Sequence, residues 1–153
     1  FMFAGEEVFR DKKGVHNSFK SPDSINAIDW TNKTKYRDQF EYYKGLVALR
    51  KAHPAFRMTD AKEIARNLKF DKIDSKKQPN LISYSLLNNA NGDEWKEIKV
   101  IFNGADHAQV VKLPKGKWQV VARDGKIDLD NTLGTVTSPE VQVSPRSALI
   151  MHR

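Results

Sequence analysis

The sequence predicts a mainly β fold, in which an antiparallel β-sandwich over residues 80–153 follows a segment with one long helix. Two observations predict the sandwich. Apolar and polar residues alternate with period two in short runs of the carboxy-terminal half, which is typical of half-buried strands. Turn sequences separate these runs at the short spacing of an all-β domain. They include Asn91-Gly92, Pro114-Lys115-Gly116 and Asp124-Gly125.

The alternation also predicts which side chains fill the sandwich. On the strand expected at residues 97–102 an apolar face alternates with charged residues, and Ile101 interrupts the polar side. Trp118 stands at an alternating strand position, which favours a core residue over an exposed sugar-stacking platform. The four other side chains expected inside the sandwich are Tyr84, Phe102, Val120 and Ile150.

The long helix is predicted from Tyr36 to the residue before Pro54, because apolar residues recur at steps of three and four. Its apolar stripe includes Phe40, Tyr43 and Val47. Gly45 inside this helix costs about 1 kcal/mol relative to alanine, which indicates that a neighbouring element approaches closely there. Residues 57–79 then connect the two regions, with a short helical turn expected near their start.

Composition excludes several classes of partner. The 26 basic residues are interleaved with 19 acidic ones, so the net charge of +7 indicates a lysine-rich surface rather than a nucleic-acid stripe. No apolar run approaches the ~20 residues of a membrane span. Without cysteine there is no thiolate zinc site, and the four histidines lack metal-ligand spacing. We therefore expect no nucleic acid, membrane, metal or cofactor, and both a cytoplasmic and a secreted location stay open.

The first thirty residues contain a short apolar run, then Gly5-Glu6-Glu7, then a polar loop rich in turn residues. Two carboxylates that cleave a glycosidic bond must flank it from opposite sides, about 5–5.5 Å apart for retention of configuration. Neighbouring residues of a strand point to opposite faces. If a strand continues through Glu6 and Glu7, they cannot flank one bond, so a structural role is favoured.

A resemblance rests on an ordered string of residues. "FAGEEVFRDKKGVHNSFKSPDSINAIDW", followed by "YYKGLVALRKAHPAFRM", resembles the carboxy-terminal part of type I pullulanases, which are debranching enzymes of the alpha-amylase family of glycoside hydrolases. The similarity covers about residues 3–58. Two positions depart from the pattern, since Asp11 stands where relatives usually have Thr and Phe19 where they often have Tyr. In the remainder, "LPKGKWQVV" and "SPRSALIMHR" are the best local matches.

The resemblance implies a domain arrangement. Residues 1–56 would be the last strand, loop and closing helix of a catalytic (β/α)8 barrel, 57–79 a connecting segment, and 80–153 the Greek-key-like sandwich called domain C. In this family the catalytic Asp, Glu and Asp follow the fourth, fifth and seventh barrel strands. All three would precede Phe1, so this chain would hold no catalytic residue and be inactive alone. The absent starting Met also indicates a piece of a longer protein.

Substrate contact is the role left to this chain, because loops that follow barrel strands line the substrate cleft. Asp23 and Asn26 are the candidates for hydrogen bonds to glucose hydroxyls, and Arg10 for orienting a carboxylate or a sugar. Each also has a structural alternative. Asp23 after Pro22 could close an Asx-turn, Asn26 could cap the loop, and Arg10 could pair with one of the two glutamates.

Two functions therefore compete. The first is the carboxy-terminal portion of a retaining α-1,6-glucan hydrolase, with pullulan, starch or glycogen branches as the partner. The second is a stand-alone carbohydrate-binding sandwich, for which exposed aromatic platforms such as Trp95 are expected rather than a loop rich in Asp and Asn. In the first case the missing barrel, or another chain, would cover the apolar stripe of the helix.

Overall fold

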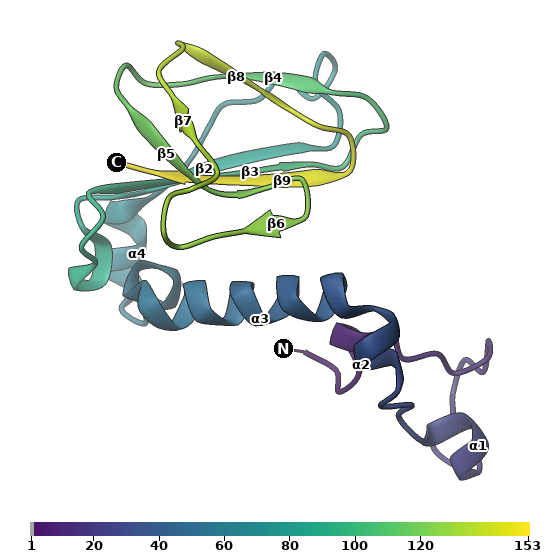
Figure 1. Ribbon diagram of the computed structural model, residues 1–153. Helices are drawn as coiled ribbons and strands as arrows, with labels where there is room; N and C mark the ends of the chain where they lie inside the picture. Colours follow the sequence, from purple (N-terminus) through teal and green to yellow (C-terminus); the bar gives the residue numbers. More distant parts are fainter. Residues whose placement is uncertain (1) are drawn as a thin grey trace. The chain divides into compact units, whose positions relative to one another are not determined.

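The computed structural model describes residues 2–153, which divide into two compact units, Phe1–Lys44 and Gly45–Arg153 (Figure 1). The division falls inside helix α3 (Arg37–Ala52). This helix confirms the element predicted from the stripe of apolar residues. Within residues 2–153 no helix combines the length and the apolar character that crossing a membrane requires.

The first unit is built from short helices and loops. They are η1 (Glu6–Val8), α1 (Asp23–Asn26), α2 (Asn32–Lys35) and the start of α3. The strand expected at the start of the chain is not formed by Met2 and Phe3, and Phe1 lies outside the described residues. A strand needs neighbours for its backbone hydrogen bonds, and residues 2–153 supply none there. A barrel strand at this position stays a prediction for a longer protein.

The second unit is an antiparallel β-sandwich, as predicted (Figure 1). Its larger sheet has seven strands in the order β1-β2-β3-β9-β5-β6, with β7 paired to β5, and its smaller sheet pairs β4 with β8. The last strand, β9, lies between β3 and β5, so segments distant in sequence are joined. The strands are β1 (Leu68–Phe70), β2 (Leu81–Leu87), β3 (Glu97–Asn103), β4 (Gln109–Lys112), β5 (Trp118–Arg123), β6 (Lys126–Ile127), β7 (Thr135–Val136), β8 (Glu140–Val143) and β9 (Ser147–His152).

A buried apolar cluster fills the space between the two sheets. Trp118 is completely buried there and Val120 almost so, which confirms both predictions. The other members are Leu81, Ile101, Val111, Leu113, Val141, Val143, Leu149 and Met151. Ile101, which interrupted the alternation in the sequence, therefore belongs to the core between the sheets.

The opposite face of the larger sheet carries a second cluster, which includes Leu49 of α3 and residues of η2 (Pro54–Arg57). Helix α4 (Ala61–Asn67), the short helical element expected in the connecting segment, precedes β1. Ile150 is buried, but in this second cluster, and Tyr84 is only partly buried beside it. The prediction that Phe102 lies inside the sandwich is wrong, since Phe102 is 43% exposed.

The error at Phe102 has a physical reason. The sheet is buried on both faces along β3, so period-two alternation does not tell the face between the sheets from the face under the helices. The second cluster covers Ile98 and Val100 but does not extend to Phe102 or its cross-strand neighbour Ile82. These two side chains are therefore exposed.

Gly45 confirms the close approach predicted from its position in the helix. A Cβ atom added to Gly45 would lie 2.0 Å from Cγ2 of Ile127 in β6. The stripe of α3 itself is only partly covered, because Phe40 and Tyr43 are half-buried and Val47 is 45% exposed. Coverage of Val47 by this chain's own sandwich is therefore not observed.

Candidate functional site

The candidate site is the loop of the first unit that holds Arg10, Asp23 and Asn26. It begins with a tight turn at Gly5, whose φ of +96° is one that L side chains rarely adopt. The Gly5 carbonyl accepts hydrogen bonds from the backbone N–H groups of Val8 (3.1 Å) and Arg10 (2.8 Å). A Cβ on Gly5 would lie 2.7 Å from Cβ of Arg10. The glycine thus lets the arginine side chain pack directly on the turn.

Arg10 is held by backbone carbonyls rather than by an acid. Its Nη1 donates to the carbonyl of Ala4 (3.2 Å) and its Nη2 to the carbonyl of Asn26. Neither Glu6 nor Glu7 forms an ion pair with it in the described part of the chain. Its Nε is buried and has no hydrogen-bond partner among residues 2–153. Arg10 therefore retains one unsatisfied donor.

Asn26 holds the loop together by hydrogen bonds, which is the structural role given above as the alternative to sugar binding. Its Nδ2 donates to the carbonyls of Ser18 (2.7 Å) and Ser21 (2.8 Å). Its Oδ1 accepts a hydrogen bond from Nζ of Lys12 at 3.1 Å, and the same Nζ donates to Oγ of Ser18 at 2.5 Å. Sequence reasoning missed Lys12, because nothing in the spacing indicates that a lysine would reach across the loop.

Asp23 lies apart from this network. It is the first residue of α1, follows Pro22, and has an exposed side chain. Asp23 forms no side-chain hydrogen bond within residues 2–153, and its backbone carbonyl accepts one from the N–H of Ala27 (2.8 Å). The Asx-turn, which was the structural alternative for Asp23, is therefore not formed within residues 2–153. The structure brings Arg10 and Asn26 together and leaves the carboxylate of Asp23 open to a ligand.

Glu6 and Glu7 lie in the helical turn η1 rather than in a strand. The argument that strand geometry separates them therefore does not apply to this structure. Oε2 of Glu7 accepts a hydrogen bond from the N–H of Gly5 at 3.1 Å, so this carboxylate serves its own turn. The structural role favoured for the pair agrees with this contact.

The second unit contains a buried polar cluster around Asp93. Its Oδ1 lies 3.0 Å from Nδ1 of His53 and accepts the backbone N–H of Trp95 at 2.9 Å. The Trp95 ring is stacked between His53 and His152, with ring centroids 3.3 and 3.8 Å apart, so Trp95 is not a free platform. Burial and the neighbouring His53 lower the pKa of His152 to about 4, against a smaller opposite effect of Asp93. In residues 2–153 no three His, Cys, Asp or Glu side chains are grouped as metal ligands.

Comparison with known proteins identifies the sandwich. Residues 64–126 match the pullulanase all-beta domain. The pullulanase of Bacillus subtilis (strain 168) is 40% identical to this chain over 114 residues, which make up 74% of the chain and 15% of that protein. The matched residues begin in α4 and extend through β1 to β5 into β6, so they cover the first part of the sandwich seen in the structure.

Solved pullulanases share the fold of the whole chain. The pullulanase from Bacillus acidopullulyticus matches with a TM-score of 0.92 and 39% identity over 100% of this chain and 18% of its own. The type I pullulanase from Bacillus subtilis str. 168, complexed with maltose, matches with a TM-score of 0.87 and 33% identity over 99% of this chain and 20% of its own. The chain therefore spans a fifth or less of the length of these pullulanases.

Proposed function

We propose that this chain is the carboxy-terminal portion of a pullulanase-like hydrolase that cleaves α-1,6 bonds of branched glucans with retention of configuration. The observation that carries the proposal is the match over 100% of the chain to a solved pullulanase, with a TM-score of 0.92 and 39% identity. Residues 1–56 would complete a catalytic barrel, 57–79 connect, and 80–153 form domain C. Pullulan, starch or glycogen branches are the proposed partner, and a matching pullulanase was solved with maltose.

The catalytic carboxylates are proposed to lie elsewhere in the longer protein. Retaining hydrolysis needs two carboxyl groups about 5–5.5 Å apart that flank the bond. Glu7 is engaged by the backbone of its own turn, and Glu6 is its neighbour in the same short helix. This chain would therefore contribute contacts at the edge of the cleft and structural support.

Of the three candidate residues, Asp23 and Arg10 would contact the substrate and Asn26 would support the loop. Asp23 would accept hydrogen bonds from glucose hydroxyls, because its carboxylate is exposed and has no partner in residues 2–153. Arg10 would donate to a carboxylate or a sugar oxygen from its terminal Nη groups, since the carbonyls of Ala4 and Asn26 use only two of their four N–H donors. Asn26, whose amide hydrogens are used by Ser18 and Ser21, would hold the loop in shape beside them.

A chimera tests the site directly. This chain would replace the superposable segment of the Bacillus subtilis pullulanase, and pullulan hydrolysis would be measured as reducing-sugar release. We expect Asp23→Ala to lower kcat/KM about tenfold, as for loss of a hydrogen bond to a charged group. Ser24→Ala, which changes an exposed neighbour in α1, is the matched control and should have no effect. Equal activities of the two variants would remove Asp23 from the proposed site.

The isolated chain is predicted not to hydrolyse pullulan. Catalysis requires a nucleophile, a general acid and a held sugar in one cleft, and only cleft-edge residues are proposed here. Reducing-sugar release above a buffer blank is the measurement. Activity that disappears on a substitution within this chain would contradict the proposal, because a contaminating enzyme would not respond to it.

One observation favours the second candidate, a carbohydrate-binding sandwich. Phe70, Tyr84 and Phe102 form a row across β1, β2 and β3, with ring centroids 5.6 and 6.4 Å apart. Phe70 is 65% and Phe102 43% exposed. Aromatic rings in such a row can stack on sugars. If the isolated chain binds maltoheptaose and Phe70→Ala together with Phe102→Ala abolishes binding, this candidate is supported.

A further inference from the structure

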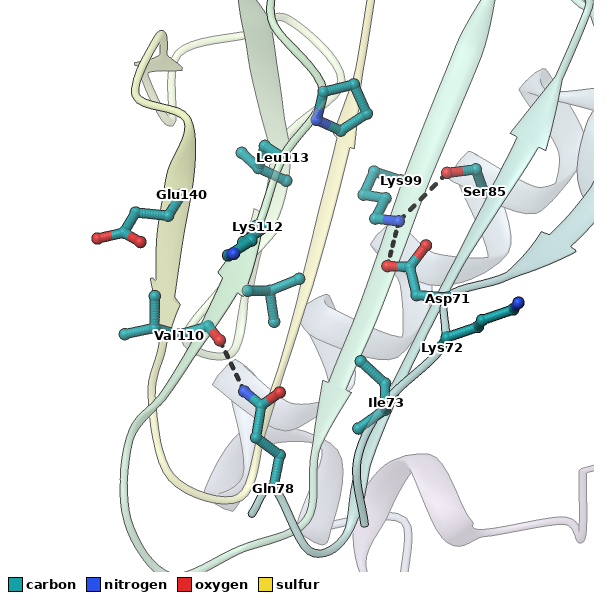
Figure 2. A pocket seen from close by; sticks show the side chains of 12 residues that line it. Asp71, Lys72, Ile73, Gln78, Ser85, Lys99, Val110, Lys112, Leu113 and Glu140 are labelled. Carbon is teal, nitrogen blue, oxygen red and sulfur yellow. Dashed lines mark hydrogen bonds and ion pairs between the residues drawn. The ribbon is translucent and has the colours of Figure 1, made fainter. Parts of the chain in front are cut away.

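The second unit contains a polar cleft that the proposed function does not use. It has a volume of about 530 Å³, within the roughly 300–1,000 Å³ of small-molecule sites. Figure 2 shows strands of both sheets beside it, with Lys99 and Asp71 on one side and Val110 and Leu113 on the other. The cleft therefore has a polar wall on one side and an apolar wall on the other.

The polar wall consists of an ion pair whose lysine is buried and whose aspartate is partly exposed, where the fold alone would favour an apolar residue in place of the lysine. Lys99 is 2% exposed, lies beside Met151 of β9 and shares a strand face with Ile101, both of which are core residues. Its Nζ lies 2.6 Å from Oδ2 of Asp71, whose side chain is 31% exposed. Because a buried ion pair seldom stabilises a fold more than apolar residues of the same size, this pair calls for another role.

The pair retains one donor and one acceptor. The Lys99 ammonium has three hydrogens and donates to Asp71 and to Oγ of Ser85 (3.3 Å), which leaves one hydrogen. Oδ2 of Asp71 accepts from Lys99 and from Oγ of Ser83 (2.6 Å). Its Oδ1 forms no hydrogen bond within residues 2–153. A hydroxyl group both donates and accepts, so it complements this arrangement better than an anion or a cation does.

Charge at the cleft agrees with a neutral ligand. Lys99 and Asp71 neutralise each other, and Figure 2 shows the side chains of Lys72 and Glu140 directed away from the space between the sheets. Lys112 also lines the cleft, but it is exposed on the outer face of β4. The opposite wall supplies aliphatic groups of Val111 and Leu113, whereas Val110 faces outward and lines the cleft through its backbone. A pyranose ring presents hydroxyls at its edge and C–H groups on its face, which matches the two walls.

We propose that this cleft binds one or two glucosyl units of an α-glucan, with sugar hydroxyls on Lys99 and Asp71 and a ring face on the aliphatic wall. The choice of an α-glucan among saccharides rests on the proposed function. The cleft would hold a branched substrate on the sandwich unit through residues of that unit alone. It would do so without the aromatic row of Phe70, Tyr84 and Phe102.

The test is a titration of the full chain with maltotriose, followed by backbone amide chemical shifts. Shifts are expected at residues 71, 85, 99 and 110–113. The variant Asp71→Leu/Lys99→Met removes both polar groups without leaving a buried charge, and should weaken binding at least about tenfold. Asp74→Leu/Lys77→Met makes the same changes in an exposed pair of the same loop, 3.7 Å apart, and should change binding less than about twofold.

A second variant keeps the test decisive if the double variant does not fold. Ile73→Trp enlarges a partly buried side chain that lines the cleft and should block maltotriose by filling the space. Shifts at the cleft with inorganic phosphate but none with maltotriose would overturn the proposal in favour of an anion site. Shifts confined to the aromatic row, or binding unchanged in both cleft variants, would also overturn it. An inactive chimera would contradict the proposed function but not saccharide binding at the cleft, so failure of one proposal can be told from failure of the other.

Discussion

At the scale of single residues, the candidate site depends on a glycine that the sequence marks only as a turn. Gly5 permits a left-handed backbone and leaves room for Arg10, whose guanidinium reaches the carbonyl of Asn26. Asn26 in turn binds the carbonyls of Ser18 and Ser21. The loop is therefore a set of side-chain-to-backbone bonds around two residues.

Replacing Gly5 by alanine should damage this loop more than the same change at Gly14. Both glycines have positive φ, +96° and +75°, but only Gly5 is packed against Arg10, and nothing lies within 4 Å of a Cβ at Gly14. Both alanine variants therefore have backbone strain, but only Gly5→Ala also clashes with Arg10. In the chimera we expect Gly5→Ala to lower kcat/KM on pullulan at least about fivefold beyond Gly14→Ala. Equal losses would show that the packing of Arg10 on Gly5 does not matter for activity.

His152 should make stability depend on pH. Its pKa is lowered to about 4 by burial first and by His53 second, whereas an unfolded histidine has a pKa near 6.5. The unfolded chain therefore binds the proton first, so stability is fully present above about pH 6.5 and is lost as pH falls toward 4. We expect the Tm of the wild type to fall more than that of His152→Gln over this window.

The control for His152 is His107→Gln, because His107 has a 59% exposed side chain. This variant should follow the wild type between pH 7.5 and 4.5, above the range in which Asp106, whose pKa its hydrogen bond to His107 lowers, takes up a proton. Parallel Tm curves of wild type and His152→Gln between pH 7.5 and 4.5 would contradict a buried, neutral His152.

At the level of secondary structure, α3 packs closely against β6 because Gly45 has no side chain. Gly45 lets the helix approach Ile127 so closely that a Cβ would lie 2.0 Å from its Cγ2. Alanine at this position gains about 1 kcal/mol of helix propensity and meets a steric clash. The contact explains why a helix retains a residue that disfavours helices.

Gly45→Ala should therefore lower the free energy of unfolding by roughly 1–3 kcal/mol, the usual cost of overpacking. Chemical denaturation measures it. The double variant Gly45→Ala/Ile127→Ala lacks the clashing methyl group, so the clash should vanish in a double-mutant cycle. Additive effects of the two substitutions would mean that the two residues do not touch in solution.

Elements whose signals are local could be predicted from the sequence. The stripe of α3, the turns between strands and the core position of Trp118 follow from spacing and turn chemistry alone. Phe102 could not be placed, because its exposure depends on how far the second cluster extends over the sheet. The pairing of β9 between β3 and β5 depends likewise on contacts distant in sequence.

The candidate site was predictable only in part, for the same reason. Residue type singled out Arg10, Asp23 and Asn26, and the roles of Arg10 and Asn26 became clear from carbonyl contacts that no pattern encodes. Lys99 was expected on the polar side of its strand, yet it is buried and paired with Asp71. A lysine at a core-facing position is the signal that could have indicated the cleft.

At the scale of the whole molecule, the chain consists of two units that differ in what holds them together. The sandwich unit has two buried apolar clusters, whereas among residues 2–36 only Gly5, Val8 and Ser18 are buried. Apolar burial is the main source of stability in a domain. The first unit is therefore expected to depend on the proposed longer protein for much of its order.

Hydrogen exchange should separate the two units. In the isolated chain we expect amides of residues 12–21 to exchange at least about a hundredfold faster than those of β3 and β9, which are paired in the middle of the larger sheet. Mass spectrometry with peptide resolution is sufficient. Equal protection in both regions would show that the loop is stable without the longer protein.

The central claim is that this chain can serve as the carboxy-terminal portion of a pullulanase. The most direct measurement is the rate of pullulan hydrolysis by the Bacillus subtilis pullulanase in which this chain replaces the superposable segment. The same enzyme truncated before that segment is the reference. We expect a kcat/KM within about tenfold of the parent enzyme and far above the truncated one, given a TM-score of 0.87. A folded chimera no more active than the truncated enzyme would contradict it.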